Sequence, residues 1–354
     1  MSMPMSEPRN ITYRQALNEA MRQEMERDRN VFVYGLDVAD HKRIFGSTAG
    51  LVEQFGKERC FSTPLSEDAL AGFGLGAAIL GLRPINVHIR ADFLLLAVNQ
   101  IMNMISGVHY VSAGAVKAPI VIRAALGRGW GQGMQHSKAP QSLFAHIPGV
   151  KVVMPTTPAD AKGLLLSAIR DDNPVIVLEH RWLYDISDHV SPDPDAVVPI
   201  GLPNILREGK DVTVIATSWM NIEALHAATI LSKHGISVEV IDPRTIAPLD
   251  DTLLVASARK TGHVIVVDFD WVNCGFSAEV AARISEHCFG QLRSPVTRIG
   301  FAPTPCPTTR PLENAFYPSA VEIIRAIEKK LQLPETDLSG ESFYSYERQF
   351  KGPF

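Results

Sequence analysis

Two residues of this 354-residue sequence combine reactive chemistry with an unusual setting, and the first is Glu67. It stands at the start of a predicted helix, directly after a short predicted strand. Gly72, Gly74 and Gly76 interrupt the apolar positions of that helix. Because each glycine costs a helix about 1 kcal/mol relative to alanine, the pattern predicts that something approaches this backbone closely. Read alone, the segment also suits a packed core helix with Ser66 as its N-cap and Glu67 on the helix dipole.

The second residue is His136, in the glycine-containing segment Gly131-Gln-Gly-Met-Gln-His-Ser137. Imidazole gains or loses a proton near neutral pH, so a mobile loop could deliver it to a cavity as an acid or base. A lone loop histidine is more often an ordinary surface residue. The choice therefore depends on the motif around it.

The glycines around His136 also allow a different interpretation. Gly127, Gly129, Gly131 and Gly133 follow a predicted strand and imitate a phosphate-binding loop, as in a dinucleotide enzyme. We favour this less, because the loop is too long and irregular for a tight Gly-x-Gly-x-x-Gly turn. No second strand ends in a suitably placed ribose-binding acid.

Strand and helix signals alternate along the first half of the chain. Strands are predicted at 31–35, 60–63, 84–89, 118–123, 150–154 and 174–179, and helices at 13–25, 67–80, 93–108, 139–146 and 158–170. This alternation predicts an α/β fold with a mostly parallel sheet and helices on both faces. Active residues in such folds gather at the carboxyl ends of strands, where both Glu67 and the His136 loop are expected.

The periodicity fails between Asp185 and Asp211, where prolines cluster. We therefore expect a first domain over 1–190, a linker over 191–210, a second α/β domain over 211–335 and a polar, aromatic tail over 336–354. In the second domain, strands are predicted at 212–216, 237–241, 264–267 and 296–299, and helices at 221–234, 251–260, 278–287 and 319–331.

Composition excludes several classes of protein. A net charge of -4 with no basic patch argues against nucleic acid, and no apolar run approaches the roughly 18 residues of a membrane span. The first ten residues lack the apolar core of a signal peptide, so we expect a cytoplasmic protein. The four cysteines, Cys60, Cys274, Cys288 and Cys306, have neither zinc-ligand nor redox spacing and are expected to be buried thiols.

A combination of motifs is more specific than any one residue. Ser66-Glu-Asp68 is followed by Gly81-Leu-Arg-Pro84, Ala91-Asp-Phe93 and Gln135-His-Ser137. Over about 11–331 the chain resembles the beta subunit of the thiamine diphosphate-dependent first component of 2-oxo acid dehydrogenase complexes, of pyruvate, branched-chain and acetoin type, within the transketolase-like superfamily. The resemblance implies a pyrimidine-binding domain at 1–190 and a transketolase C-terminal-like domain at 211–335.

The resemblance also implies roles for individual residues. Glu67 matches the family glutamate that hydrogen-bonds the aminopyrimidine of thiamine diphosphate, and Phe93 matches the aromatic residue that stacks on that ring. His136 matches the histidine that handles the substrate carboxylate or acyl transfer to lipoamide. A potassium site would use carbonyls of Ile120, Ala168 and Ile169 with Asp171 and Asn173, although the same segment suits an ordinary helix end.

Three departures from the family pattern leave the substrate open. Leu36 replaces an acidic residue after the first strand, Arg90 is charged where many relatives are neutral, and Lys138 begins an unusual continuation after Gln-His-Ser.

The sequence contains no Gly-Asp-Gly, the superfamily pattern that holds magnesium and the diphosphate. We therefore expect that a second polypeptide carries the magnesium ligands. The resemblance implies that this partner is an alpha subunit, without which the enzyme is inactive, in an alpha-two, beta-two heterotetramer. It also implies a small 2-oxo acid as the substrate and transfer of the acyl group to the lipoyl acyltransferase component. Two alternatives stay open: a subunit of a non-oxidative transketolase-type or acyloin-type ligase, and a catalytically silent assembly subunit.

Overall fold

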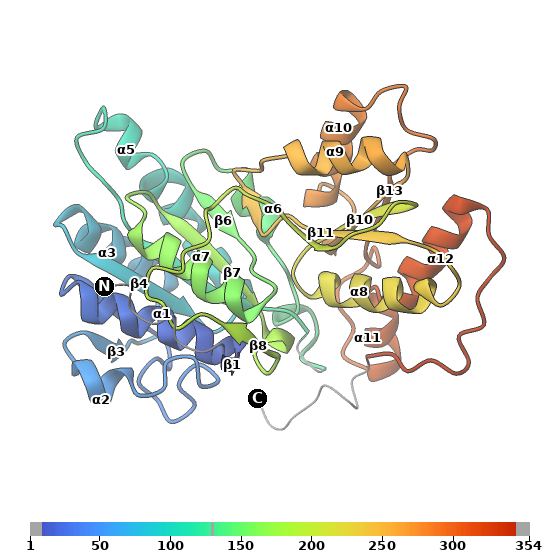
Figure 1. The fold of residues 1–354 in the computed structure, drawn as a ribbon. Helices are drawn as coiled ribbons and strands as arrows, with labels where there is room; N and C mark the ends of the chain where they lie inside the picture. The colour runs from blue at the N-terminus through green and yellow to red at the C-terminus, as the bar shows by residue number, and fades with distance from the viewer. Residues whose placement is uncertain (1–8, 129–130, 345–354) are drawn as a thin grey trace, which may run out of the picture. The chain divides into compact units, whose positions relative to one another are not determined.

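A computed structural model describes residues 9–128 and 131–344 of the chain. The described residues fall into two compact units, which we treat separately (Figure 1). Unit 1 lies within Met1–Leu126, Leu143–Ile200 and Thr245–Pro248, and unit 2 lies within Gly127–Ser142, Gly201–Arg244 and Leu249–Phe354. The chain passes between the two units more than once, so each unit contains segments that are far apart in the sequence.

The core of unit 1 is a seven-stranded sheet with the order β12-β6-β7-β5-β4-β2-β3. All neighbouring strands are parallel except β12, which runs antiparallel to β6. The strands are β2 (Val31–Gly35), β3 (Cys60–Ser62), β4 (Arg83–His88), β5 (Val121–Leu126), β6 (Lys151–Val153), β7 (Val175–His180) and β12 (Thr245–Ala247). Every residue of β2, β5 and β7 is buried, as expected for strands covered on both faces.

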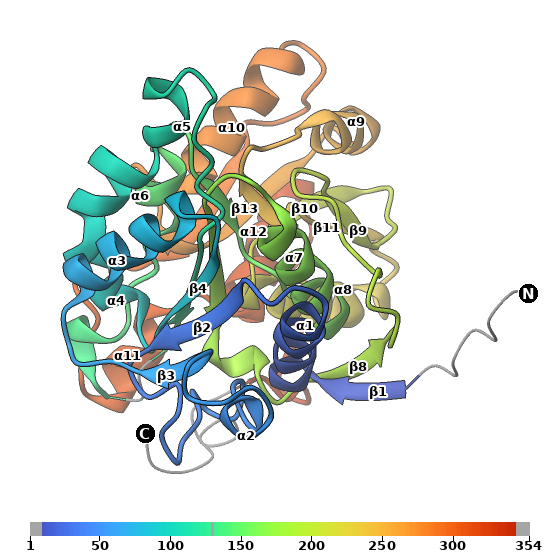
Figure 2. The same ribbon diagram turned by 90° about the vertical axis from the view of Figure 1, so that its left-hand side faces the viewer.

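Helices cover both faces of this sheet. Figure 2 shows α1 and α7 on one side of β2 and β4, and α3 and α4 on the other. The helical segments are α1 (Tyr13–Arg27), α2 (Leu51–Phe55), α3 (Glu67–Ile79), α4 (Ala91–Leu94), η1 (Leu95–Ala97), η2 (Gln100–Ile105), α5 (Val108–Val111), α6 (Gln141–Ala145), α7 (Pro158–Arg170) and η4 (Arg181–Leu183). The first two residues of α6 belong to unit 2. A separate antiparallel pair joins β1 (Arg9–Thr12) to β8 (Ser187–Val190).

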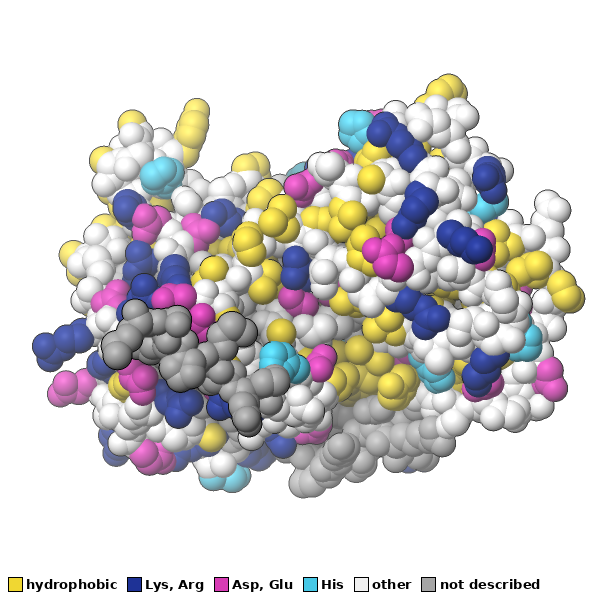
Figure 3. Space-filling view, viewed as in Figure 1, with side chains coloured by type: hydrophobic (Ala, Val, Ile, Leu, Met, Phe, Trp, Pro, Cys, Tyr) yellow, Lys and Arg dark blue, Asp and Glu magenta, His cyan; other side chains and the backbone are white. Residues whose placement is uncertain are grey.

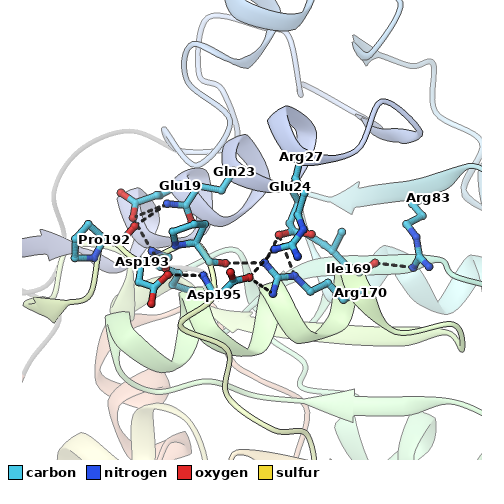
Figure 4. A network of polar contacts seen from close by, with 12 residues as sticks. Glu19, Gln23, Glu24, Arg27, Arg83, Ile169, Arg170, Pro192, Asp193 and Asp195 are labelled. Atoms are coloured by element: carbon cyan, nitrogen blue, oxygen red, sulfur yellow. Dashed lines mark hydrogen bonds and ion pairs between the residues drawn. The ribbon is translucent and has the colours of Figure 1, made fainter. Parts of the chain in front are cut away.

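Helices α1 and α7 are joined by one buried and one partly buried ion pair (Figure 4). The ammonium of Lys162 lies 2.9 Å from a Glu19 carboxylate oxygen and also donates to backbone carbonyls of the 191–193 segment. Arg170 donates to Glu24 at 2.6 Å. Buried charges are stable only when they are paired, so this network has a structural explanation.

Unit 2 contains a five-stranded sheet with the order β14-β13-β10-β11-β9, parallel except for β9. Its strands are β9 (Asn204–Arg207), β10 (Val212–Ala216), β11 (Val238–Asp242), β13 (Val264–Trp271) and β14 (Thr297–Phe301). Its helical segments are η3 (Gly133–Gln135), α8 (Trp219–Ser232), α9 (Thr252–Thr261), α10 (Phe276–His287), α11 (Arg310–Phe316) and α12 (Ala320–Leu331). The predicted α/β class with two mostly parallel sheets is confirmed.

Several local predictions were wrong. The helix predicted over 93–108 is divided into α4, η1, the π-helical η2 and α5. The expected linker contains β9, and α2, α11, β1, β8 and β12 were not anticipated. Cys274 is exposed rather than buried, whereas the other three cysteines are buried free thiols.

Part of the C-terminal tail packs on α8. Phe343 and Tyr344 lie 5.3 and 5.7 Å from the His226 ring, measured between ring centroids. Tyr344 also meets Trp219 edge-on at 5.1 Å. The later aromatics of the tail, Tyr346 and Phe350, lie outside the described residues.

On the face shown in Figure 3, acidic and basic side chains are interspersed, and no large patch of one charge is visible. Across the described residues, no single helix has the length and apolar character needed to cross a membrane. One pair of helical segments, Ala91–Ala97 with Gln100–Val111, passes on length and composition when taken together, and it is bent by 60°.

Candidate functional site

Glu67 is the first residue of α3, and Ser66 at the N-cap makes no side-chain capping bond. The free N–H groups and dipole of a helix N-terminus favour a carboxylate there. Glu67 is half-buried, whereas the neighbouring Leu65 is 71% exposed. In this chain, Glu67 therefore lies at the surface of unit 1, beside an uncovered apolar side chain.

The glycines of α3 have different neighbours. A Cβ on Gly74 would lie 2.3 Å from the Tyr34 hydroxyl oxygen and 2.6 Å from Ile120 Cδ1. A Cβ on Gly72 would lie 3.3 Å from the Gln100 side chain, whereas Gly76 has nothing within 4 Å. The predicted close approach is therefore internal at Gly74, and Gly76 leaves a bare stretch of exposed helix.

Phe93 lies in α4, the short helix that follows β4. It is half-buried, and α4 begins after Arg90, whose carbonyl accepts the Phe93 N–H at 3.2 Å. Because β3 and β4 both run parallel to β2, Glu67 and Phe93 follow strands that end at the same edge of the sheet. The structure therefore brings these two predicted residues to the carboxyl edge of unit 1.

Sequence reasoning missed a buried polar group at this edge. His88 ends β4, and its Nε2 lies 2.7 Å from Oδ1 of the buried Asn86, which requires a proton on that nitrogen. His180 ends β7, and its Nδ1 accepts the Trp182 N–H at 3.1 Å. Polar residues at alternate positions of an apolar strand, Asn86 and His88, were the available signal.

Burial keeps both histidines neutral near pH 7. Loss of solvation lowers the pKa of His88 to about 4. The same effect, with the positive charges of Arg90 and Arg181, lowers the pKa of His180 to about 3. Neutral imidazoles at this edge are able to donate or accept hydrogen bonds without adding charge.

His136 belongs to unit 2, in the loop between β5 and α6. It is half-buried and follows directly after η3. Gly131 and Gly133 both have positive φ, and a Cβ at either position would press on Thr308. Gly129 lies outside the described residues. The loop runs into a single 3-10 turn, which is unlike the strand, tight turn and long helix of a dinucleotide site.

The His136 loop is fixed within unit 2 at several points. Its Gly131 N–H donates to the buried Glu313 at 3.2 Å, and Arg128 lies 3.1 Å from the same carboxylate. The Tyr317 hydroxyl donates to the Ser137 carbonyl at 3.4 Å. A mostly apolar cavity of about 560 Å³ lies beside the loop, between Met134, Ser137, Lys138, Trp271 and Cys306.

The residues proposed for potassium come together at the opposite edge of the sheet in unit 1. Ile120 precedes β5, and the segment from Ala168 to Asn173 precedes β7, so both lie at the amino ends of strands. Asn173 donates from its N–H and its Nδ2 to one Asp171 oxygen, at 2.9 and 3.2 Å.

Basic groups also bind this loop. Arg83 donates to the Ile169 carbonyl at 2.9 Å (Figure 4) and to the Asp171 carbonyl at 3.0 Å, and Lys151 pairs with the Asp171 carboxylate. No cluster of three or more His, Cys, Asp or Glu suited to a metal occurs within 9–128 and 131–344. The oxygens that could coordinate potassium here are carbonyl and amide oxygens and those of a single carboxylate.

Comparisons with known proteins identify the family. Residues 9–186 match the transketolase pyrimidine-binding domain, and residues 201–323 match the transketolase C-terminal domain. The 2-oxoisovalerate dehydrogenase subunit beta of Bacillus subtilis (strain 168) is 43% identical over 321 residues, which are 91% of this chain and 98% of that protein. The chain belongs to the family of 2-oxo acid dehydrogenase beta subunits.

Other members of this family are nearly as similar. The mitochondrial pyruvate dehydrogenase E1 component subunit beta of Ascaris suum is 41% identical, over 92% of this chain and 91% of that one. The acetoin:2,6-dichlorophenolindophenol oxidoreductase subunit beta of Cupriavidus necator (strain H16) is 39% identical, over 92% and 98%. A solved structure named as a split-gene transketolase, inactive beta4 tetramer, aligns with a TM-score of 0.73 and 25% identity, over 91% of this beta subunit and 99% of that chain.

Proposed function

We propose that this chain is the beta subunit of a thiamine diphosphate-dependent 2-oxo acid dehydrogenase, which decarboxylates a 2-oxo acid and transfers the acyl group to a lipoyl domain. The observation that carries the proposal is Glu67 at the N-terminus of α3, on the carboxyl edge of the sheet with Phe93, in a chain about 40% identical to such subunits.

This chain would supply the half-site for the aminopyrimidine. When bound there, thiamine diphosphate would supply a carbanionic carbon that adds to the carbonyl carbon of the 2-oxo acid. Glu67 would hold a proton on a carboxylate oxygen against the ring nitrogen, and the Phe93 ring would stack on the ring face. His136 would transfer a proton through its imidazole in a later step. Half-buried positions for all three residues suit groups that receive a ligand from outside the chain.

The other half of the site would come from an alpha subunit, which also supplies the magnesium ligands. Exposed apolar side chains support this partner, because soluble monomers rarely expose large contiguous apolar surfaces. Phe73 on α3 and Leu80 at its C-cap are 50% and 84% exposed, and the bare Gly76 belongs to the same helix. The adjacent η1 and η2 add Leu96 and Met102, both exposed. We expect Leu80→Lys, at the most exposed of these side chains, to prevent co-purification with the alpha subunit while leaving the chain folded.

The test of the function is an assay of the chain co-expressed with its alpha subunit. With thiamine diphosphate and magnesium, a set of 2-oxo acids should reduce an artificial electron acceptor, and a lipoyl domain should become acylated. Dye reduction without lipoyl acylation would favour the second candidate, a carbon–carbon ligase of transketolase or acyloin type. Lys138 beside the 560 Å³ cavity and the likeness to a split-gene transketolase favour that candidate.

Potassium binding is a further part of the proposal. Carbonyl and carboxylate oxygens are ligands that suit a hard cation, and potassium would compete with Arg83 and Lys151 for the oxygens of Ile169 and Asp171. We expect a higher thermal unfolding midpoint in potassium chloride than in choline chloride at equal ionic strength. If the midpoints in the two salts were equal, in wild type as in Asn173→Ala, potassium would be removed from the proposal.

A further inference from the structure

Two buried carboxyl groups in unit 2 have no part in the proposed chemistry. Asp268 and Asp270 lie in the second half of β13, two residues apart, so both side chains project from the same face of the strand. Asp268 is fully buried and Asp270 is nearly so. A buried carboxyl group needs hydrogen-bond donors.

The donors come from the segment that carries His136. The Gln141 side-chain N–H₂ donates to Asp268 Oδ1 and to the Phe269 carbonyl, both at 3.0 Å. The Ser142 hydroxyl donates to Asp270 Oδ2 at 2.7 Å. Gln141 and Ser142 are the first two residues of α6, only five and six positions after His136.

The carboxyl groups are themselves held in place. The Thr217 hydroxyl donates to Asp268 Oδ1 at 2.7 Å and accepts the Phe269 N–H at 3.2 Å. The Trp271 N–H donates to Asp270 Oδ1 at 2.7 Å. Burial raises the pKa of Asp268, and burial with the neighbouring Asp268 raises the pKa of Asp270 to about 7, so the pair has reason to retain a proton at neutral pH.

The other end of the loop has its own acidic anchor. Glu313, fully buried on α11, accepts the Gly131 N–H and pairs with Arg128. The loop therefore spans two carboxyl anchors of unit 2, one before His136 and one after it. This explains why 127–142 packs with unit 2 although the strands on either side of it, β5 and β6, belong to unit 1.

We propose that Asp268 and Asp270 are positioning residues that fix the start of α6 and thereby set the place of the His136 imidazole. The inference rests on the proposed role of His136. It concerns residues that touch neither substrate nor cofactor, and it predicts that their loss acts through His136 alone.

The experiment uses the complex of this chain with its alpha subunit, and measures cofactor affinity, dye reduction and acylation of a lipoyl domain. Asp268→Asn should leave cofactor affinity unchanged and lower kcat of the step that His136→Ala impairs, by about ten- to a hundredfold, because a small displacement of a reacting group has that effect. Added to His136→Ala, the Asp268→Asn change should cause no further loss, because coupled residues are not additive.

A change on the loop side tests the pair directly. Gln141→Ala removes the donor to Asp268 Oδ1 and to the Phe269 carbonyl without changing a carboxyl group, and should lower the same kcat by a similar factor. Ser142→Ala is a milder variant that removes one donor from the loop without changing a carboxyl group. The matched control is Glu239→Gln, which alters a buried carboxylate of β11 that pairs with Lys260 and has no contact with the loop.

The control should lose stability but keep wild-type rates. A fully additive loss in the His136→Ala background would overturn the inference, as would normal kcat in both Asp268→Asn and Ser142→Ala beside an impaired His136→Ala. Wild-type rates in His136→Ala would contradict the proposed role of His136, and with it the inference that rests on that role. Amide hydrogen exchange in 131–140, which should quicken in Asp268→Asn, reports the anchoring independently of activity.

Discussion

The proposed role of Glu67 depends on a single carboxylate, and Glu67→Gln tests it. The amide keeps the size and polarity of the side chain at the N-terminus of α3, so the fold should survive with a change of under about 1 kcal/mol. It cannot exchange a proton with the aminopyrimidine, so decarboxylation by the complex should fall at least about a hundredfold. Near-wild-type turnover in a dye-reduction assay would remove the central assignment.

At the same scale, the sequence predicted residues that motifs mark and missed those that depend on distant partners. The places of Glu67 and Phe93 after β3 and β4 followed from the alternation of strands and helices. Arg123 and Glu179 form a buried ion pair at 2.6 Å, to which the Tyr184 hydroxyl adds a bond at 2.7 Å. Nothing local in a run of apolar residues shows that two charged positions 56 residues apart will pair.

The glycines of α3 give a prediction about an element. Gly74→Ala should destabilise unit 1 by about 1–3 kcal/mol, because its methyl group would overlap the Tyr34 hydroxyl and Ile120. Gly76→Ala has open space and should stabilise the isolated chain by about 0.5–1 kcal/mol through helix propensity. Urea unfolding of both variants checks the difference. A Gly76→Ala chain that is more stable yet assembles poorly would mark that face of α3 as a contact with the alpha subunit.

Helix α8 gives a prediction about pH. Glu223 accepts the Trp219 indole N–H at 2.9 Å and the Ala320 N–H at 3.0 Å, and burial raises its pKa to about 7. The folded chain thus holds this proton more tightly than the unfolded chain. Ionisation of Glu223 therefore lowers the free energy of unfolding progressively as pH rises from about 5 through 7, by up to about 3 kcal/mol.

Glu223→Gln should remove this dependence. The variant should match wild type near pH 4, where the acid is protonated in both the folded and the unfolded chain, and exceed it in stability at pH 8.5. Denaturant unfolding of both proteins at the two pH values is the measurement. An equal difference between them at both values would contradict the raised pKa.

Elements were predicted well where their periodicity was regular and poorly where tertiary packing decides. Helices α7 and α12 have clear caps, at Thr157 and Ser319, and were anticipated within about a residue or two. The predicted helix over 93–108 has an uninterrupted apolar pattern, yet it contains a π-helical segment, η2, against α3. Short edge strands such as β9 and β12 are too brief for a periodic signal.

At the scale of the whole molecule, the expectation concerns incompleteness. The chain has no Gly-Asp-Gly, and it leaves Glu67 half-buried beside an exposed Leu65. Purified alone with thiamine diphosphate and magnesium, it should show neither tight binding nor decarboxylation, and it should gain both when co-expressed with an alpha subunit. Stoichiometric, magnesium-dependent binding by the isolated chain in a calorimeter would overturn the half-site interpretation.

The sequence order alone could not show how segments are shared between the two units. A reader of the sequence assigns 127–142 to the first domain, because strands of that domain flank it. The carboxyl groups that hold the segment, on β13 and α11, lie more than a hundred residues later, and no local pattern connects them. Long-range hydrogen bonds, rather than chain proximity, decided its place.

Strand β12 has a consequence for how the protein is made. It closes the outer edge of the first sheet by pairing Thr245 with Val153 and Ala247 with Val152. A ribosome releases β6 long before it releases β12, so the nascent chain presents an open strand edge while most of the intervening residues are still being synthesised. A shortened gene ending near residue 200 would leave that edge open permanently, and its product should aggregate more readily than the full-length chain.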